Sequence, residues 1–231
     1  MAGRFITFEG GEGAGKTTQM RRLAEFLGER GIEVVTTREP GGTPRAEAVR
    51  EALLAGKLQS LGPEAEALAF AAARVDHIDK LIRPSLKSGK WVLCDRFIDS
   101  TRAYQGAADG VDMELIGFLE RVAVGHTKPN LTLILDVPVE IGLKRAAERR
   151  AGEPSKGKGR GKGKAKAKAP PEADRFEATD AELHERRRKA FLDIARQEPL
   201  RCVVVQADRS EDDIARDIRE VVEQRLLASV G

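Results

Sequence analysis

The sequence predicts one doubly wound α/β domain, in which helices cover both faces of a five-stranded parallel sheet. Short, almost wholly apolar segments alternate along the chain with segments of helical hydrophobic spacing, which is typical of parallel strands buried on both faces. The first apolar segment also ends at a glycine-rich turn that a helical pattern follows at once. With 231 residues, 41% hydrophobic and 33% charged, the chain has an ordinary globular composition. We therefore expect one domain spanning residues 1–231.

The elements follow in regular order. Strands are predicted at 5–8, 32–37, 91–94, 131–135 and 202–205, each rich in apolar or β-branched residues. Met20, Leu23, Ala24 and Leu27 fall on one face of a first helix, which Gly31 can terminate. Further helices are predicted around 44–55, 64–88, 138–150 and 181–196. A last helix carries Ile214, Ile218, Val221 and Val222 on one face and is capped at Ser210.

The whole-chain features favour a cytoplasmic protein without a membrane span. No apolar run approaches the roughly 20 residues that cross a bilayer, and the first residues lack the apolar stretch of a secretory signal. The two cysteines, Cys94 and Cys202, both fall in predicted strands. Two buried thiols in a reducing compartment is the interpretation we favour, and a disulfide between them is the alternative.

The basic character of the chain is concentrated in one segment. Residues 155–169 carry seven Lys and Arg residues and no acid, alternating with glycine or alanine. Removing these seven charges from the formal net charge of +3 leaves −4 for the rest of the chain. We expect 151–173 to be a disordered insertion within a lid region at 145–180. Its lysines could attract nucleotides, bind nucleic acid or a membrane surface, or merely be solvated. We favour a solvated segment, because a segment without aromatics cannot read bases.

The glycine-rich turn matches the phosphate-binding pattern G-x-x-x-x-G-K-[ST]. Its backbone N–H groups can cradle phosphate oxygens, and the helix that follows points its positive end at them. Lys16 can reach the β- and γ-phosphates of a nucleotide, and Thr17 can offer a hydroxyl to Mg²⁺. The residues predicted to bind the nucleotide are Gly10, Gly11, Glu12, Gly13, Ala14, Gly15, Lys16, Thr17 and Thr18.

Other motifs narrow the class of nucleotide-binding protein. The N-K-x-D tetrad with which GTPases read guanine is absent from the sequence. The third strand ends in Cys94-Asp95-Arg96, and not in a D-x-x-G switch. An arginine directly after the acidic residue suits a small kinase whose second substrate is itself a phosphate. Two alternatives stay open: a kinase for another nucleoside monophosphate or a deoxynucleoside, and a nucleic-acid-dependent ATPase.

Several further stretches carry a family resemblance. They are Phe8-Glu9-Gly10, Thr37-Arg38-Glu39-Pro40-Gly41-Gly42-Thr43, Asp95-Arg96-Phe97, the string 100–106 and the helix segment 68–77. In order and spacing the chain resembles the thymidylate kinase family, except in the lysine-rich insertion. The resemblance implies transfer of the γ-phosphoryl group of Mg-ATP to dTMP, giving dTDP and ADP. It also implies a homodimer, with the region 64–88 as the contact.

The resemblance assigns residues to the nucleobase of the acceptor. Phe70 and Arg74 lie four apart on a predicted helix and can face one ligand. Phe70 is implied to stack on thymine and Arg74 to donate to a base carbonyl, with Thr101 and Gln105 as further base contacts. Tyr104 is implied to lie against the sugar. Phe70 could instead be a core aromatic, and Tyr104 a partly buried core residue.

The resemblance also assigns residues to the acceptor's sugar and phosphate. Glu12 is implied to accept a hydrogen bond from the 3′-hydroxyl. Arg96 is implied to bind the 5′-phosphate through both prongs of its guanidinium, and Asp95 to hold Mg²⁺ through water. Arg38 either touches the acceptor phosphate or forms an ion pair with Glu39.

The predicted catalytic residues combine the phosphate-binding loop with the lid. An arginine must neutralise charge on the transferring group, and the loop carries no basic residue at 11–14. The resemblance implies that the lid supplies this arginine. Arg149 and Arg150 are our choice beside Lys16 and Arg96, and Arg145 and Arg175 are further candidates. Any of the lid arginines could instead lie on an exposed face. We expect Asp76 and His77 to lie at the helix surface or a subunit interface.

Overall fold

The computed structural model describes residues 3–152 and 181–228. Most of the lysine-rich segment predicted to be an insertion, and Arg175 with it, lies outside the described residues. The predicted cap of the last helix is present: the Ser210 hydroxyl accepts a hydrogen bond from the backbone N–H of Asp213.

Five parallel strands form the predicted sheet, in the order β2-β3-β1-β4-β5. The central strand β1 pairs Phe5 with Val92 of β3 on one side and Ile6 with Leu131 of β4 on the other. The bounds are β1 Phe5–Glu9, β2 Val34–Arg38, β3 Trp91–Asp95, β4 Leu131–Asp136 and β5 Cys202–Gln206. The prediction of a doubly wound parallel sheet is therefore confirmed.

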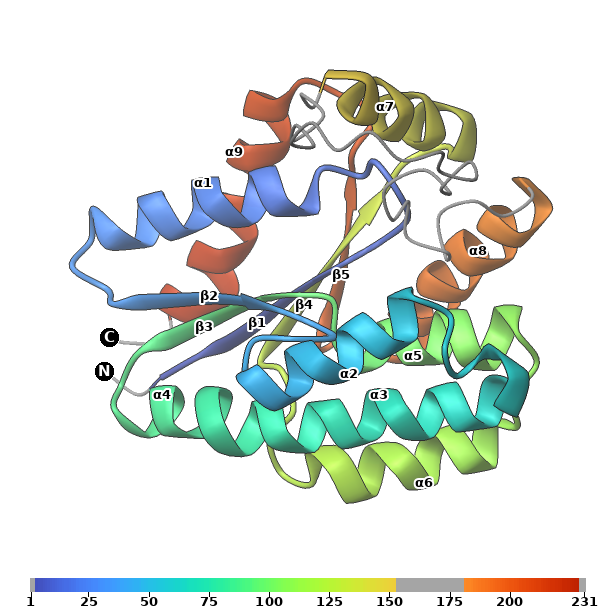
Figure 1. The fold of residues 1–231 in the computed structure, drawn as a ribbon. Coiled ribbons are helices and arrows are strands. Elements are labelled where there is room, and N and C mark those ends of the chain that lie inside the picture. The colour runs from blue at the N-terminus through green and yellow to red at the C-terminus, as the bar shows by residue number, and fades with distance from the viewer. Residues whose placement is uncertain (1–2, 153–180, 229–231) are drawn as a thin grey trace, which may run out of the picture.

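Helices cover both faces of the sheet (Figure 1). Two of them, α1 (Lys16–Gly28) and α9 (Glu211–Val222), pack on one face. The opposite face carries α3 (Pro63–His77), α6 (Met113–Val124) and α8 (Ala181–Gln197). The remaining helical segments are α2 Pro44–Leu54, η1 Gln59–Leu61, η2 Ile78–Ile82, α4 Arg83–Lys87, α5 Ile98–Thr101, η3 Arg102–Ala108, α7 Val139–Gly152 and η4 Glu223–Leu227.

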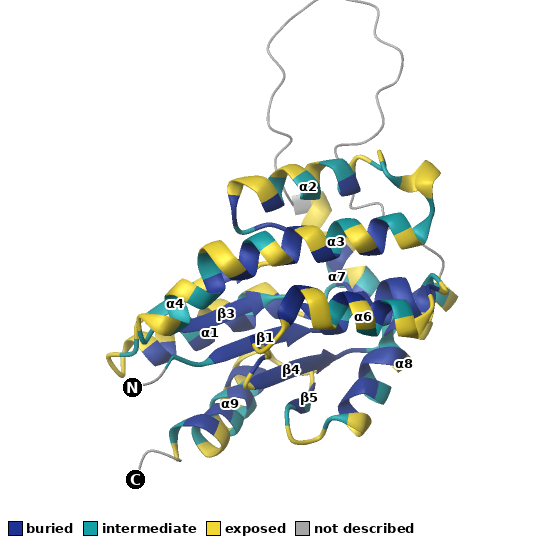
Figure 2. Ribbon diagram, turned by 90° about the horizontal axis from the view of Figure 1, so that it is seen from below, coloured by how far each residue is buried: buried dark blue, intermediate teal, exposed yellow. Residues whose placement is uncertain are grey.

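Alternating side chains of β1 divide the core between the two faces. Ile6 and Phe8 pack with the α1 and α9 side chains, whereas Phe5 packs with those of α3 and α6. All three side chains have no exposed surface. Buried positions accordingly run through the strands and the inner sides of the helices in Figure 2. Cys94 and Cys202 are both buried free thiols, as the preferred interpretation expected.

Besides the single turn η1, two helical regions were not predicted. In α6 the signal was available, because Ile116, Leu119 and Ala123 form a buried stripe after a cap at Asp112. The stretch α5–η3 lacks such a stripe, since its buried positions include Asp99, Thr101 and Gln105. These polar residues are buried because they have specific partners. They interrupt the regular spacing of apolar residues from which a helix is predicted.

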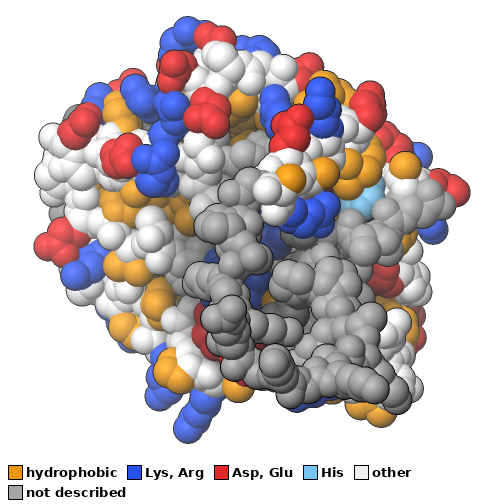
Figure 3. All heavy atoms as spheres, turned by 45° about the horizontal axis from the view of Figure 1, so that its top comes forward, with side chains coloured by type: hydrophobic (Ala, Val, Ile, Leu, Met, Phe, Trp, Pro, Cys, Tyr) orange, Lys and Arg blue, Asp and Glu red, His pale blue; other side chains and the backbone are white. Residues whose placement is uncertain are grey.

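The described surface is mixed in charge. Lys and Arg side chains are interspersed with Asp and Glu over the face drawn in Figure 3. Within 3–152 and 181–228, no helix combines the length and apolar character that a bilayer crossing needs.

Candidate active site

The carboxyl ends of β1, β2 and β3 open onto a cavity of about 330 Å³. Loops at this edge of a doubly wound sheet are the usual place for ligands. The lining combines the glycine-rich loop, the loop after β2, the α5–η3 stretch and one side of α3. The predicted residues that line it are Glu12, Gly13, Ala14, Gly15, Lys16, Thr17, Thr18, Arg38, Phe70, Arg74, Asp95, Arg96, Thr101, Tyr104, Gln105 and Arg149.

The glycine-rich loop is folded for an anion. Gly15, directly before α1, has a left-handed conformation (φ 86°), and no side chain caps the helix. The first N–H groups of α1 therefore stay open to a ligand. Lys16 bends back to donate to the carbonyls of Gly10 and Gly11 at 3.0 and 2.8 Å. Burial, and then the neighbouring charge of Arg96, lowers the pKa of Lys16.

Close packing explains one glycine of this loop. A Cβ on Gly13 would lie 2.0 Å from the carbonyl oxygen of Gly142 in α7, and its φ of +63° disfavours other residues. The first turns of α7 therefore rest directly on the phosphate-binding loop.

Thr17 and Asp95, the two predicted metal ligands, lie in direct contact. The Thr17 hydroxyl donates to Asp95 Oδ2 at 3.0 Å. Asp95 Oδ1 is buried and has no hydrogen-bond partner among the described residues. Mg²⁺ prefers oxygen ligands and often takes only one or two from the protein, with phosphate and water completing its shell. A hydroxyl beside a half-satisfied carboxylate fits that requirement. In the described part of the chain, no group of three or more His, Cys, Asp or Glu side chains is arranged so that it could hold a metal ion.

Arg96 has the only positive φ (67°) among the described non-glycine residues. Its guanidinium donates to Glu12 Oε1 at 3.1 Å and Ser100 Oγ at 3.3 Å, and lies 4.9 Å from the centre of the Tyr104 ring. Burial alone would lower the pKa of Arg96, but the charges of Tyr104, Glu12 and the other nearby acids raise it overall. Strained backbone that aims a permanent cation into a cavity is typical of a binding site.

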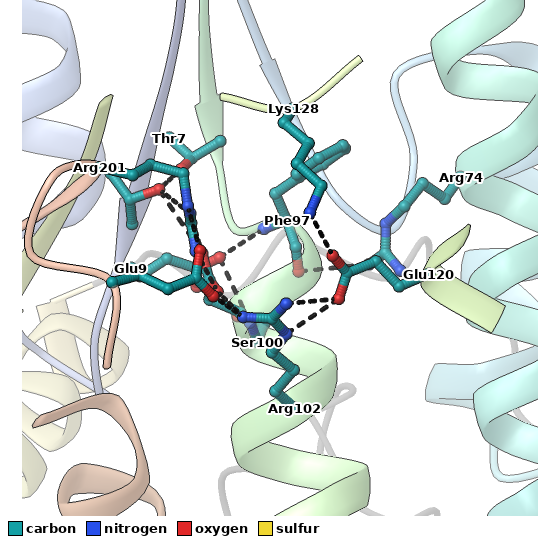
Figure 4. A network of polar contacts seen from close by, with 12 residues as sticks. Thr7, Glu9, Arg74, Phe97, Ser100, Arg102, Glu120, Lys128 and Arg201 are labelled. Atoms are coloured by element: carbon teal, nitrogen blue, oxygen red, sulfur yellow. Dashed lines mark hydrogen bonds and ion pairs between the residues drawn. The ribbon is translucent and has the colours of Figure 1, made fainter. Parts of the chain in front are cut away.

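Glu9 holds the loop that carries Arg96, which the sequence did not indicate. This fully buried carboxylate accepts from the backbone N–H of Phe97 at 2.8 Å and from the N–H and hydroxyl of Ser100 at 3.3 and 2.6 Å (Figure 4). Burial, and then the nearby Asp99, raises the pKa of Glu9 to about 7. The available signal was an acidic residue at the end of an apolar strand.

Ion pairs anchor the other side of the α5–η3 stretch (Figure 4). Asp99 has no exposed surface and accepts from Arg201 at 2.7 and 3.0 Å. Arg102 bonds Glu120 and Glu198. Although burial alone would raise it, hydrogen bonds from Arg201 and Arg102 lower the pKa of Glu198 to about 2. These ion pairs join the α5–η3 stretch to α6 and to the segment before β5, and they fix one wall of the cavity.

The residues predicted to bind the base share one pocket wall. Phe70 is half-buried, lies in none of the core clusters and lines the cavity, so the core alternative for it is wrong. Gln105 is 2% exposed, and its Nε2 has no partner among the described residues; the hydroxyl of Tyr104 is also buried and unbonded. Buried polar atoms without partners need an explanation. A polar ligand in this cavity would provide one.

Arg74 is held from three sides. Its Nε donates to Glu39 Oε2 at 2.7 Å, and its Nη2 donates to the carbonyl of Phe97 and to Thr101 Oγ1 at 3.2 and 3.0 Å. The alternative pairing of Arg38 with Glu39 is therefore wrong. Glu39 serves Arg74 instead.

Arg38 has a partner that the sequence did not indicate, and the prediction for His77 needs correction. Arg38 pairs with both carboxylate oxygens of Glu47 at 3.0 Å, and still lines the cavity. His77 is fully buried and bonds Thr37 and Glu39, so it lies neither at the helix surface nor at a subunit interface. The spacing of apolar residues along α3 did not indicate that His77 has these polar partners.

The arginines proposed for the lid are placed unequally. Arg149 and Arg150 are both exposed near the end of α7, and only Arg149 lines the cavity. Arg145 donates to the carbonyl of Ala207 at 2.7 Å. A further arginine was missed: Arg187 of α8 is 2% exposed and lies 4.4 Å from the centre of the Tyr104 ring.

One cavity is thus lined by the glycine-rich loop, by Thr17 and Asp95 as candidate metal ligands, by the strained Arg96 and by a wall with unbonded polar atoms. A loop suited to a nucleoside triphosphate beside an arginine suited to a second phosphate is the arrangement expected of a nucleoside-monophosphate kinase.

Comparison with known proteins narrows that class. The family model described as thymidylate kinase matches residues 8–218, so the chain belongs to the thymidylate kinase family. A thymidylate kinase of Bradyrhizobium sp. strain BTAi1 is 50% identical over 99% of this chain and 93% of the relative. One from Rhodopseudomonas palustris strain CGA009 is 50% identical over 98% and 91%. The crystal structure of thymidylate kinase from Ehrlichia chaffeensis matches with a TM-score of 0.71 at 37% identity, covering 96% of this chain and 99% of that one.

Proposed function

We propose that the chain transfers the γ-phosphoryl group of ATP to dTMP, giving dTDP and ADP. The observation that carries this proposal is the single cavity joining Lys16 and the phosphate-binding loop to the wall of Phe70, Arg74 and Gln105. The unbonded Gln105 amide and the half-buried Phe70 ring provide a polar and a stacking contact for a pyrimidine.

The reaction needs no strong general base, because the attacking phosphate oxygen is already anionic. Catalysis then depends on positioning and on neutralising charge. Lys16 leaves the carbonyls of Gly10 and Gly11 to bind the β- and γ-phosphates. Arg96 exchanges part of its contact with Glu12 for the acceptor phosphate, and the carboxylate of Glu12 accepts from the 3′-hydroxyl of the sugar. Tyr104 packs against the sugar, and Thr101 adds a base contact.

In this proposal Thr17 and Asp95 would hold Mg²⁺ through their side-chain oxygens. A bound ion would supply positive charge that offsets the charge of the transferring phosphates. Asp95 Oδ1, buried without a partner among the described residues, is the atom that supports this assignment.

Arg149 is the lid arginine that the geometry favours, because it lines the cavity while Arg150 does not. We keep both as catalytic candidates. Replacing each by Ala separates them: the catalytic arginine should lower kcat with little change in the KM for dTMP. Equal effects of the two replacements would contradict the preference for Arg149.

Steady-state ADP production from Mg-ATP with dTMP, dUMP, dCMP, dGMP, AMP and thymidine tests the reaction. We expect strong preference for dTMP, with some turnover of dUMP, since one methyl group is worth only about 1–3 kcal/mol. Turnover with a different acceptor alone would discard the base-pocket assignment. Absence of turnover with every acceptor, but ATP hydrolysis stimulated by DNA or RNA, would favour the nucleic-acid alternative.

A homodimer is proposed through an apolar surface on α3 and α6, which pack side by side. Its exposed residues are Leu68, Val75, Met113, Phe118 and Val122. Exposed apolar side chains that gather on neighbouring helices mark an interaction site. Light scattering should give twice the chain mass for the wild type and one chain mass for Phe118→Glu. A monomeric wild type would overturn the proposal.

Location in the cytoplasm also stays a proposal, supported by the two free thiols.

A further inference from the structure

A chain of buried hydrogen bonds runs behind Arg74. Glu39 accepts from Arg74 Nε through one oxygen at 2.7 Å, and its other oxygen contacts His77 Nδ1 at 3.0 Å. His77 Nε2 in turn contacts Thr37 Oγ1 at 2.8 Å. The side chains of Arg74 and Glu39 are each 5% exposed, and that of His77 is not exposed at all. This chain of hydrogen bonds therefore lies in a water-poor interior, where hydrogen bonds are strong.

The direction of the chain follows from its chemistry. A carboxylate can only accept, so His77 Nδ1 carries a proton and donates it to Glu39. His77 Nε2 and Thr37 Oγ1 share the next hydrogen bond, in which Thr37 donates when the imidazole is neutral. Each member thus orients the next, from the end of β2 to the guanidinium on α3.

The backbone closes over this chain at Gly42. A Cβ there would lie 2.5 Å from both His77 Nε2 and Thr37 Oγ1, and the φ of Gly42 is +87°. Only glycine fits at that point. The loop after β2 therefore seals the chain from the side opposite to Arg74.

These hydrogen bonds leave Nη1 of Arg74 for a ligand. Its Nε and Nη2 are committed to Glu39, Phe97 and Thr101. Nη1 has no bond to the described residues, and Arg74 lines the cavity.

Resting on the proposed function, we propose that Thr37, His77 and Glu39 are positioning residues that hold Arg74 with Nη1 toward the base of dTMP. Thr37 and His77 do not line the cavity, so they act only through Arg74. Loss of one of these hydrogen bonds lets the Arg74 guanidinium adopt other orientations. The fraction of protein molecules in which Arg74 is placed to bind dTMP then falls.

Thr37→Val tests this with least disturbance, because valine keeps the shape and removes only the hydroxyl. The loss of one net hydrogen bond, converted to a change in binding, predicts a rise of about 2–10-fold in the KM for dTMP. The KM for ATP and kcat should stay near their wild-type values. Thr37→Ser retains the hydroxyl and should restore the KM, while Glu39→Gln should raise it more than Thr37→Val does.

Thr127→Val is the matched control. Thr127, like Thr37, is a buried threonine whose hydroxyl has a side-chain partner: it accepts from Arg83 Nε at 2.9 Å, and neither residue lines the cavity. It should lower stability in urea without changing either KM. If Thr37→Val also lowers only stability, or changes the KM values for ATP and dTMP equally, the positioning role is wrong. If the wild type itself does not use dTMP, the proposed function fails first.

Discussion

Replacing Glu9 by glutamine should change how the stability of the protein depends on pH. The substitution suits the site, because the amide oxygen can still accept from the N–H groups of Phe97 and Ser100. The amide NH₂ can donate to Ser100 Oγ, which contacts the present carboxylate at 2.6 Å. Glutamine therefore imitates the protonated form of Glu9 without removing its contacts.

The size of this change in stability with pH follows from the burial of the Glu9 carboxyl. Its pKa rises from an ordinary 4.5 to about 7 because of burial and then the charge of Asp99. As pH rises from 4.5, the unfolded chain loses this proton first, so the folded state binds more protons and its stability falls with pH. The contribution of Glu9 is complete below about pH 4.5 and is lost as pH passes about 7. The gap between the two values corresponds to about 3 kcal/mol.

Urea unfolding of both proteins without nucleotide, from about pH 4 to about pH 8, measures this effect. Other titrating groups contribute to both proteins, so the difference in free energy of unfolding, wild type minus Glu9→Gln, isolates Glu9. We expect this difference to fall by about 3 kcal/mol between pH 4.5 and 7 and to be flat beyond. Parallel curves across the whole range would refute the reasoning about the buried carboxyl.

Three further outcomes can be checked on the same protein. Gly142→Ala should cost about 1–3 kcal/mol in urea and raise the KM for ATP, because its Cβ would lie 2.4 Å from the carbonyl of Glu12. Gly117→Ala, whose Cβ meets only a flexible arginine at 3.5 Å, should instead stabilise the protein by about 0.5–1 kcal/mol, and equal losses would contradict the steric account. Ser210→Ala should lower the free energy of unfolding by about 1 kcal/mol through loss of a helix cap, and an unchanged urea midpoint would contradict this. Lys16→Met should lower kcat about 10²–10³-fold in the ADP assay, and a normal kcat would remove Lys16 from the mechanism.

Local patterns predicted the parts of the molecule that local physics determines. The five strands follow from short apolar runs, and the loop at Gly13 and Lys16 follows from a motif whose spacing is dictated by phosphate geometry. The first helix follows from its apolar spacing. These features need only neighbouring residues, so the sequence alone was sufficient for them.

The polar interior could not be predicted in the same way. Glu9 bonds residues about 90 positions later, and Glu39 meets Arg74 across 35 positions. Such pairs depend on the register of the sheet and the packing of α3, which single-sequence patterns do not specify. His77 illustrates the error: with a charged neighbour on a helix it resembled a surface residue, yet it has no exposed surface.

The two arginines of the acceptor pocket differ in how their partners hold them. Arg74 and Glu39 are each 5% exposed, and a buried pair of this kind is costly to break. The side chain of Arg96 is 22% exposed in its pair with Glu12, and the 3.1 Å contact uses one prong. An incoming phosphate dianion can therefore replace the contact of Arg96 at little cost, whereas Arg74 must receive its ligand without leaving Glu39. Substitutions at Glu39 should consequently change dTMP affinity. Substitutions at Glu12 should also change kcat, because Glu12 bonds Arg96, which we propose to contact the acceptor phosphate.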